Sequence, residues 1–300
     1  MRILITGGTG VIGRPLCGQL LARGHELTVL SRKPESVKRK CGEAVAAMGS
    51  LEEWAPDRVF EAVINLAGEP IFGGRWSRAR KARLWDSRVT LTERLVERIA
   101  AAEQRPAVLI SGSAVGYYGD GGDAELTETS VAGHDFGARL CEAWESAAVK
   151  ASGLGLRVCL VRTGLVLSKE GGLLGRMLPA FRLGLGARLG NGQQWMSWIH
   201  IDDYLGALIN LLENTSASGA YNVTAPNPVT NAEFTRTLAQ VLRRPAFLVA
   251  PAPVLRSVMG EMAELMLGGQ RAIPEGIRKV NVQFKYRDLQ SALDALLGGR

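Results

Sequence analysis

Arg2-Ile3-Leu4-Ile5-Thr6-Gly7-Gly8-Thr9-Gly10-Val11-Ile12-Gly13 opens the chain with a short apolar run and a glycine-rich turn. A helical pattern follows at 14–24, and a second apolar run at 25–30 closes on Ser31-Arg32-Lys33. Strand, glycine turn, helix and strand in this order predict a βαβ unit of the kind that binds dinucleotides. The remaining chain repeats the alternation, which predicts an α/β fold with a doubly wound parallel sheet of six or seven strands.

The glycines of the turn are three residues apart, and each has a predicted use. Gly7 allows the chain to turn sharply off the strand, and Gly10 lacks a Cβ, so a pyrophosphate can approach the backbone. Gly13 allows the helix to pack close to the sheet, and the helix N-terminus attracts phosphate. A tight turn without a ligand is the less favoured alternative. The residues predicted to contact a cofactor here are Gly7, Thr9, Gly10, Val11, Ile12 and Gly13.

The glycine spacing and the run Thr-Gly-Gly-Thr-Gly-Val-Ile-Gly resemble the extended short-chain dehydrogenases/reductases. In that family the second strand often ends in an acid that holds the adenosine ribose of NAD, whereas here it ends in Ser31-Arg32-Lys33. A carboxylate would repel a 2′-phosphate, and a guanidinium pairs with it through two hydrogen bonds. We therefore predict NADP(H) as the cofactor, with Ser31, Arg32 and Lys33 around its 2′-phosphate. The alternative is that Arg32 and Lys33 are solvated loop charges.

The composition limits the other partners. The chain has 300 residues, of which 46% are hydrophobic, and a net charge of +7. No apolar run approaches the ~20 residues that span a bilayer, and the N-terminus does not read as a signal peptide, so we expect a cytoplasmic protein without a membrane partner. The basic residues cluster at 32–40 and 75–88 without a nucleic-acid motif. A phosphate-rich cofactor accounts for part of this charge, and we expect no nucleic-acid partner.

The cysteines show no metal-ligand spacing, so we expect free thiols and no metal site. They are Cys17, Cys41, Cys141 and Cys159. The sequence leaves the oligomeric state open.

Other predicted cofactor contacts rest on the resemblance. Leu66, Ala67 and Gly68 end a predicted strand at 60–66 and resemble the family's turn against the adenosine and the bridging phosphates. Arg88 stands where the family has an asparagine that faces the cofactor. Arg162 ends the strand at 157–162, before a turn that resembles the family's turn after its sixth strand. An ordinary strand-to-loop turn explains 66–68 about equally well.

The predicted catalytic residues also come from the resemblance. The segment Ser111-Gly112-Ser113-Ala114-Val115-Gly116-Tyr117-Tyr118 is similar to one in which a hydroxyl hydrogen-bonds the reacting carbonyl. Ser113 is the best match and Ser111, assigned to the cofactor, is the second, while either Tyr117 or Tyr118 takes the tyrosine position. The alternative is that these are turn residues.

The family's Tyr-x-x-x-Lys pair is absent, because this chain reads Phe136-Gly137-Ala138-Arg139-Leu140. The tyrosine would be the acid/base and the lysine would lower its pKa. His200 is a candidate cleft base. The resemblance favours a different role, in which His200 orients a loop and Asp202 caps the helix that follows.

The whole chain resembles one subgroup, the atypical short-chain dehydrogenases/reductases called epimerase family proteins. The resemblance implies a Rossmann fold with residues 1–165 as the NADP-binding domain, to which part of 190–225 returns. Residues 166–244 would form substrate-cleft elements, and residues 245–300 a small C-terminal domain of unknown function. A stripe of methionines suggests one core-packed helix at 251–268.

Two classes of function follow from the resemblance. One is an NADP(H)-dependent oxidoreductase, or a nucleotide-sugar-epimerase-like protein, acting on a small carbonyl or hydroxyl substrate. The other is an NADP(H)-binding sensor or partner protein without turnover, linked to cell division.

Overall fold

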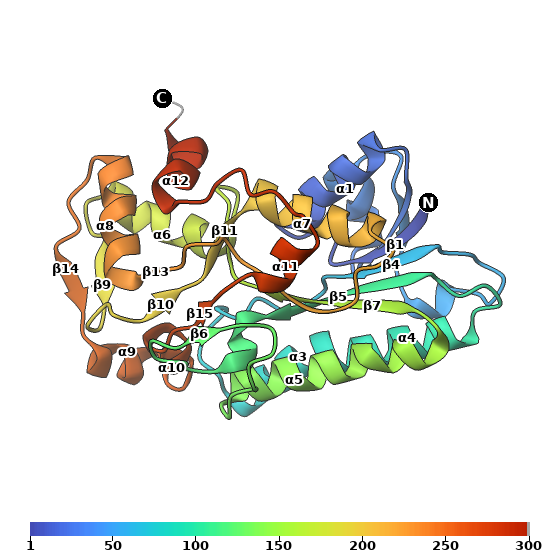
Figure 1. The fold of residues 1–300 in the computed structure, drawn as a ribbon, viewed down its shortest axis with the longest axis horizontal. Helices are drawn as coiled ribbons and strands as arrows, with labels where there is room; N and C mark the ends of the chain where they lie inside the picture. The colour runs from blue at the N-terminus through green and yellow to red at the C-terminus, as the bar shows by residue number, and fades with distance from the viewer. Residues whose placement is uncertain (299–300) are drawn as a thin grey trace.

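A seven-stranded parallel sheet forms the centre of the computed structural model, which describes residues 1–298 (Figure 1). The strand order is β12-β7-β5-β4-β1-β2-β3, so the chain leaves β1 first toward one edge and then, from β4 onward, toward the other. This confirms the predicted doubly wound sheet. The strands are β1 (Arg2–Thr6), β2 (Glu26–Leu30), β3 (Ala46–Met48), β4 (Ala62–Asn65), β5 (Val108–Ala114), β7 (Arg157–Thr163) and β12 (Gly219–Val223).

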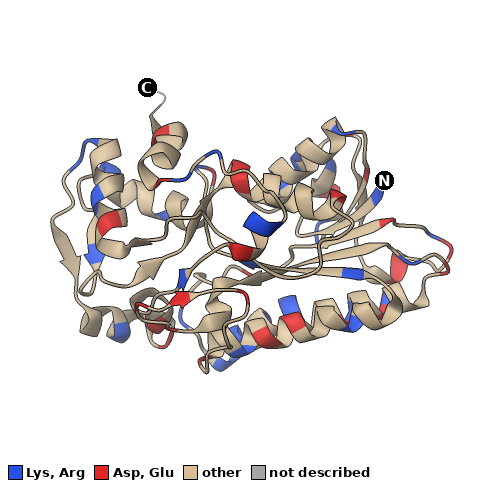
Figure 2. Cartoon of the chain, in the orientation of Figure 1, with Lys and Arg blue, Asp and Glu red and all other residues tan. Residues whose placement is uncertain are grey.

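Two layers of helices cover the sheet (Figure 1). Residues of α1 (Gly13–Ala22), α2 (Val37–Cys41) and α7 (Ile201–Glu213) share one apolar cluster with one face of the strands. Residues of α4 (Leu91–Ala101) and α5 (Phe136–Val149) pack on the opposite face. Figure 2 shows charged residues spaced along the helices of this second layer, as expected of helices with one solvated side.

The helical segment between β4 and β5 is interrupted. It consists of α3 (Arg78–Trp85), a π-helical turn at Asp86–Thr90 and then α4. Such turns inside α-helices often occur at functional sites, because the extra residue redirects the neighbouring side chains. Here the turn carries Arg88.

The second half of the chain builds a smaller lobe beside the carboxyl ends of the strands (Figure 1). Its apolar cluster joins α6 (Gly172–Arg182), α8 (Asn231–Leu242) and α12 (Leu289–Leu297) around the buried Trp198. The predicted boundary at 244/245 therefore crosses a shared core. The short strands of this half are β8 (Leu165–Leu167), β9 (Ala187–Leu189), β10 (Trp195–Met196), β11 (Trp198–His200), β13 (Val229–Thr230) and β14 (Leu248–Ala250).

The single helix expected at 251–268 is two helices, α9 (Ala252–Met259) and α10 (Met262–Leu267). Gly260 separates them with φ of +62°, a left-handed conformation that ends a helix. After α10, β15 (Arg271–Ala272) pairs with β6 (Glu125–Leu126) in a separate two-stranded sheet, and α11 (Glu275–Lys279) follows. No helix in residues 1–298 is long and apolar enough to cross a membrane.

Candidate functional site

A cavity of about 690 Å³ lies at the carboxyl ends of β1, β4, β5 and β7, where open α/β sheets bind ligands. The glycine turn lines it at one end, and the second half of the chain closes it at the other. Of the residues predicted from the sequence, those in its wall are Gly7, Val11, Ile12, Gly13, Leu66, Gly68, Arg88 and Ser113.

The glycine turn is tightly packed except on the side where a ligand would lie. Gly7 has φ of +72°, and a Cβ there would lie 2.5 Å from the carbonyl oxygen of Leu66. A Cβ on Gly13 would lie 2.4 Å from the carbonyl oxygen of Gly7, so Gly13 is needed against the turn itself rather than against the sheet. A Cβ on Gly10 would meet only the Gly7 oxygen, at 3.2 Å. No side chain caps the N-terminus of α1, which leaves it available to an anion.

The residues after β2 form an exposed basic corner. The Arg32 side chain is 89% exposed and donates a hydrogen bond to Glu69 Oε1 at 2.7 Å. This hydrogen bond is the main reason that the pKa of Glu69 lies below its ordinary value. Lys33 is also exposed, and its backbone N–H donates to the half-buried Ser31 hydroxyl at 3.1 Å.

A buried amide joins the ends of β1, β4 and β5. Asn65 Oδ1 accepts the Thr6 hydroxyl at 2.6 Å, and Asn65 Nδ2 donates to Thr92 at 2.8 Å and to Ser111 at 3.3 Å. Ser111 has no exposed surface, and the structure places its hydroxyl against Asn65 and outside the cavity lining. The backbone N–H of Ala67 donates to the Thr6 hydroxyl at 3.1 Å, which holds the turn after β4 against β1.

Arg88 reaches the cavity wall from the π-helical turn. Its guanidinium donates to the backbone carbonyl of Glu69 at 2.9 Å and lies 5.4 Å from the ring centre of Trp144. Burial lowers its pKa from the ordinary arginine value. A Cβ on Gly68 would lie 2.9 Å from the guanidinium, so a larger residue at this position would have to displace Arg88.

A second, buried ion pair packs against residues 111–118, which we call the catalytic segment because the candidate catalytic residues Ser113, Tyr117 and Tyr118 lie in it. The Ser113 hydroxyl donates to Glu145 Oε1 at 2.6 Å, and Arg162 donates to both Glu145 oxygens at 2.8 Å. The Arg162 and Glu145 side chains are only 5% and 8% exposed. Burial by itself lowers the pKa of Arg162, but the Glu145 carboxylate offsets this and raises its pKa above the ordinary value. Sequence reasoning missed Glu145, because nothing near it in the chain indicates its partners.

Arg162 and both tyrosines of the catalytic segment face this network and not the cavity. Arg162 donates to the Tyr118 hydroxyl at 3.0 Å and stacks 3.6 Å from the ring centre of Tyr117. The Tyr118 hydroxyl in turn donates to Asn222 at 2.7 Å. The guanidinium of Arg162 and the hydroxyl of Tyr118 are thus paired in the interior, and neither of these residues nor Tyr117 is among those that line the cavity.

His200 is also a structural residue. It is 3% exposed, and its Nδ1 accepts the backbone N–H of Asp202 at 3.0 Å, so His200 itself caps α7. Burial lowers the pKa of His200, while the Asp202 and Asp203 carboxylates act against that shift. The prediction that Asp202 is the cap was wrong, and His200 is not among the residues that line the cavity, so its role as a cleft base stays a prediction.

The positions of the missing Tyr/Lys pair are occupied by apolar packing. Phe136 lies edge-on to Trp76, at 5.1 Å between ring centres. Leu140 is buried and lines the cavity beside Ser113. Trp76 also lines the cavity.

Two polar side chains that the sequence did not single out line the cavity. Tyr204 shares a hydrogen bond of 2.9 Å with Thr163, and burial raises its pKa to about 12. Gln194 donates through Nε2 to the carbonyl oxygens of Leu189 and Met266, while its buried Oε1 has no partner among the described residues. Both lie far along the chain from the glycine turn.

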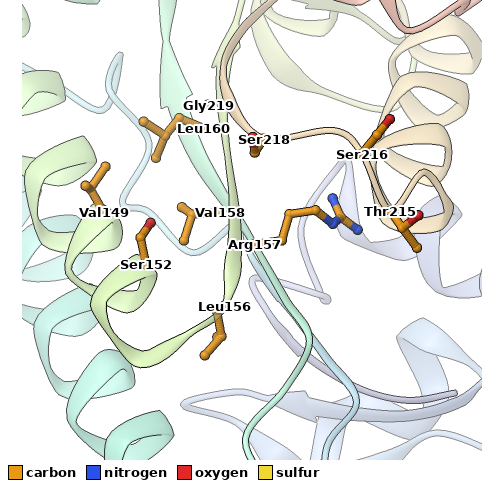
Figure 3. A pocket seen from close by; sticks show the side chains of 10 residues that line it. All are labelled: Val149, Ser152, Leu156, Arg157, Val158, Leu160, Thr215, Ser216, Ser218 and Gly219. Atoms are coloured by element: carbon orange, nitrogen blue, oxygen red, sulfur yellow. The ribbon is translucent and has the colours of Figure 1, made fainter.

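A second hollow, of about 550 Å³, lies at the amino end of β7 (Figure 3). Figure 3 shows the Arg157 side chain extended toward Thr215 and Ser216. Its guanidinium donates to the backbone carbonyls of Leu211, Leu212 and Ala217, so it closes the end of α7. The charged side chain of this lining is therefore already paired with backbone carbonyls.

Within residues 1–298 no cluster of three or more His, Cys, Asp or Glu side chains could hold a metal ion. All four cysteines are free and buried. Cys141 lines the cavity, and burial raises its pKa to about 12, so it stays a protonated thiol there.

Comparison with known proteins gives two family matches. The NAD dependent epimerase/dehydratase family matches residues 3–224, and a domain of unknown function (DUF1731) matches residues 250–296. An Arabidopsis thaliana protein, described as the chloroplastic homolog of epimerase family protein SDR39U1, is 40% identical over 303 residues. The alignment covers 99% of this chain and 87% of that protein. Because that relative is chloroplastic, the cytoplasmic location expected here stays a prediction.

Two solved structures are similar along nearly the whole chain. The crystal structure of human epimerase family protein SDR39U1 (isoform 2) with NADPH has a TM-score of 0.91 and 37% identity, and covers 100% of both chains. The nucleoside-diphosphate sugar epimerase from Corynebacterium glutamicum has a TM-score of 0.75 and 34% identity, and covers 99% of this chain and 58% of that one.

Proposed function

Because this chain belongs to the NAD dependent epimerase/dehydratase family, we propose that it binds NADPH and is an oxidoreductase for a small carbonyl or hydroxyl substrate. The observation that carries the proposal is the continuous cavity, which joins the glycine turn to Ser113 in one wall. The human relative crystallised with NADPH supports the choice of cofactor.

The residues present fit such a cofactor. The uncapped N-terminus of α1 and the side of Gly10 without a Cβ suit a pyrophosphate. Arg32 and Lys33, both exposed after β2, would hold a 2′-phosphate, with the Ser31 hydroxyl beside them. When bound, the nicotinamide supplies the hydride that reduces a carbonyl, or accepts one from a carbinol.

Ser113 would orient the substrate as a hydrogen-bond acceptor. A hydroxyl has one proton to donate, and Ser113 donates it to Glu145. The Ser113 oxygen therefore offers its lone pairs to the cavity, which revises the expectation that it donates to a carbonyl. A substrate hydroxyl or an amide N–H is the group that this oxygen can bind.

The second candidate is an NADPH-binding sensor or partner protein without turnover. The observation in its favour is the apolar packing of Phe136 and Leu140, where the family's acid/base pair would stand. Tyr204 is the cavity's remaining phenol, and it shares its hydrogen bond with Thr163. The two candidates agree on the cofactor and differ on catalysis.

The decisive experiment combines binding with turnover. NADPH fluorescence titration is expected to show stoichiometric binding to the wild type and none to Gly10→Val, whose branched Cβ occupies the phosphate side. Gly18→Val is the matched control, because Gly18 lies in α1, after the turn, and a Cβ there meets no atom within 4 Å. Steady NADPH consumption with a panel of aldehydes and ketones supports the oxidoreductase, and binding without consumption supports the sensor. Absence of NADPH binding would refute both.

A further inference from the structure

The half of the cavity beyond Ser113 is apolar. It is formed by the loop before α3, by α6 and by α10. Among the described lining residues Arg88 is the single charged side chain, and it lies at the nucleotide end, beside Gly68. Representative side chains of the apolar half are Phe72, Trp76, Leu173, Met177, Phe181 and Met266.

Three arginines near this half are paired within the protein or face away from it. Arg176 of α6 donates to the backbone carbonyl of Phe72 at 3.0 Å. Arg188 lies between Ala187 and Leu189 in β9, and since those two line the cavity, Arg188 faces the other side of the strand, against Gly192. Arg271 stacks 4.6 Å from the ring centre of Trp195 and pairs with Glu125 at 3.2 Å. The apolar half therefore presents no cation to a ligand.

This lining disfavours a diphosphate. Charged phosphate oxygens that leave water need charge-assisted hydrogen bonds in return, and burying them against apolar side chains without such bonds is costly. A ligand with methylene or ring carbons gains free energy from the same surface, in proportion to the apolar area that it buries.

Two polar side chains of the lining, Ser113 and Gln194, offer hydrogen-bond acceptors. Ser113 donates its proton to Glu145, so its lone pairs face the cavity. Elsewhere in the wall, Gln194 Nε2 donates to the carbonyl oxygens of Leu189 and Met266. Its buried Oε1 has no hydrogen-bond partner among the described residues. Acceptors at two places in the wall of an apolar space complement a ligand that carries hydroxyl or N–H donors.

We propose that the cleft binds a neutral, largely apolar molecule that carries a hydroxyl group, and not a nucleoside-diphosphate sugar. The inference rests on the proposed function, because it assumes that NADPH fills the nucleotide end. It names the substrate class of the same site, which neither the family nor its relatives specify for this chain.

The test uses the full chain saturated with NADPH, and calorimetric titration with 2-hexanol, 2-octanol, 2-decanol and UDP-glucose. Each added methylene is expected to tighten binding about fourfold, so 2-decanol should bind about 200-fold more tightly than 2-hexanol. UDP-glucose is expected to give no binding. An absence of chain-length dependence, or tighter binding of UDP-glucose than of 2-decanol, would overturn the inference.

Two leucines of one loop provide matched variants. Leu185 lines the cavity and is 57% exposed, so Leu185→Glu should fold, and it is expected to weaken 2-decanol binding at least tenfold. Leu183 is 75% exposed and outside the lining, so Leu183→Glu should leave 2-decanol binding unchanged. Equal effects of the two substitutions would also count against the inference. NADPH affinity is measured separately: its absence in the wild type refutes the proposed function, whereas intact NADPH binding without alcohol binding refutes only the substrate class.

Discussion

Two carboxylates in this protein each bond an arginine, in opposite surroundings. Glu69 accepts from Arg32 at the nucleotide end, where the arginine side chain is 89% exposed and the glutamate 20%. Glu145 accepts from Arg162 behind the catalytic segment, where both side chains are less than a tenth exposed. Glu69 has a second, longer contact with Arg80 at 3.5 Å, whereas Glu145 also accepts the Ser113 hydroxyl.

This difference in burial determines which arginine can exchange its carboxylate partner for a ligand. An exposed ion pair in water contributes about 0–1 kcal/mol, so Arg32 can leave Glu69 for a 2′-phosphate at little cost. A buried pair cannot be separated without leaving an uncompensated charge in the interior. We therefore expect the Glu69 pair to act as an exchangeable contact and the Glu145 pair to hold Ser113 in a fixed orientation.

The largest expected effect is on the buried pair. Glu145→Ala leaves Arg162 buried without its carboxylate and should lower the free energy of unfolding by about 3–5 kcal/mol. Denaturant unfolding followed by circular dichroism measures this. Glu142→Ala, at an exposed position of the same helix, is the control and should change stability little. If Glu145→Ala lowered the free energy of unfolding by less than about 1 kcal/mol, the buried pair would contribute no more than the exposed Glu69 pair.

Cofactor preference tests the exchangeable pair. Arg32→Ala removes the guanidinium expected at the 2′-phosphate, whose charge-assisted hydrogen bonds contribute about 1.5–3 kcal/mol each. The wild type should prefer NADPH over NADH by on the order of a hundredfold, and the variant should lose most of that preference through weaker NADPH binding.

Calorimetry with both cofactors measures the preference, and Arg39→Ala, at an exposed position in α2, is the control for general loss of positive charge. The wild-type preference should also shrink as salt rises, because the corner is exposed. Equal affinity of the wild type for the two cofactors would contradict the assignment of Arg32.

The smallest expected effect is at Glu69. Glu69→Gln frees Arg32 and removes a negative charge near the proposed phosphate position, so NADPH should bind about threefold more tightly, within the range of an exposed ion pair. The free energy of unfolding should change by less than about 1 kcal/mol. Fluorescence titration and denaturant unfolding measure the two quantities. Weaker NADPH binding would mean that Glu69 positions Arg32 instead of competing for it.

The local sequence pattern was enough to predict the fold and the position of the glycine turn. A strand, a glycine turn and a helix depend on side-chain periodicity and backbone conformation within about thirty residues, so the first βαβ unit and the sheet could be read directly. The absence of a tyrosine and a lysine at Phe136 and Leu140 is likewise a property of the residues themselves.

Only the tertiary structure decided the roles of the polar residues at the other end of the cavity. Ser111 and Ser113 are two residues apart in one strand, yet Ser111 bonds Asn65 in the interior and Ser113 lines the cavity. Arg162 pairs with Glu145, 17 residues away, and Tyr118 with Asn222, 104 residues away. A hydrogen-bonding group has few protons and lone pairs, so its function depends on which partners the fold brings to it. The sequence identifies each such group, but its partners lie far away in the chain and are set by the tertiary structure.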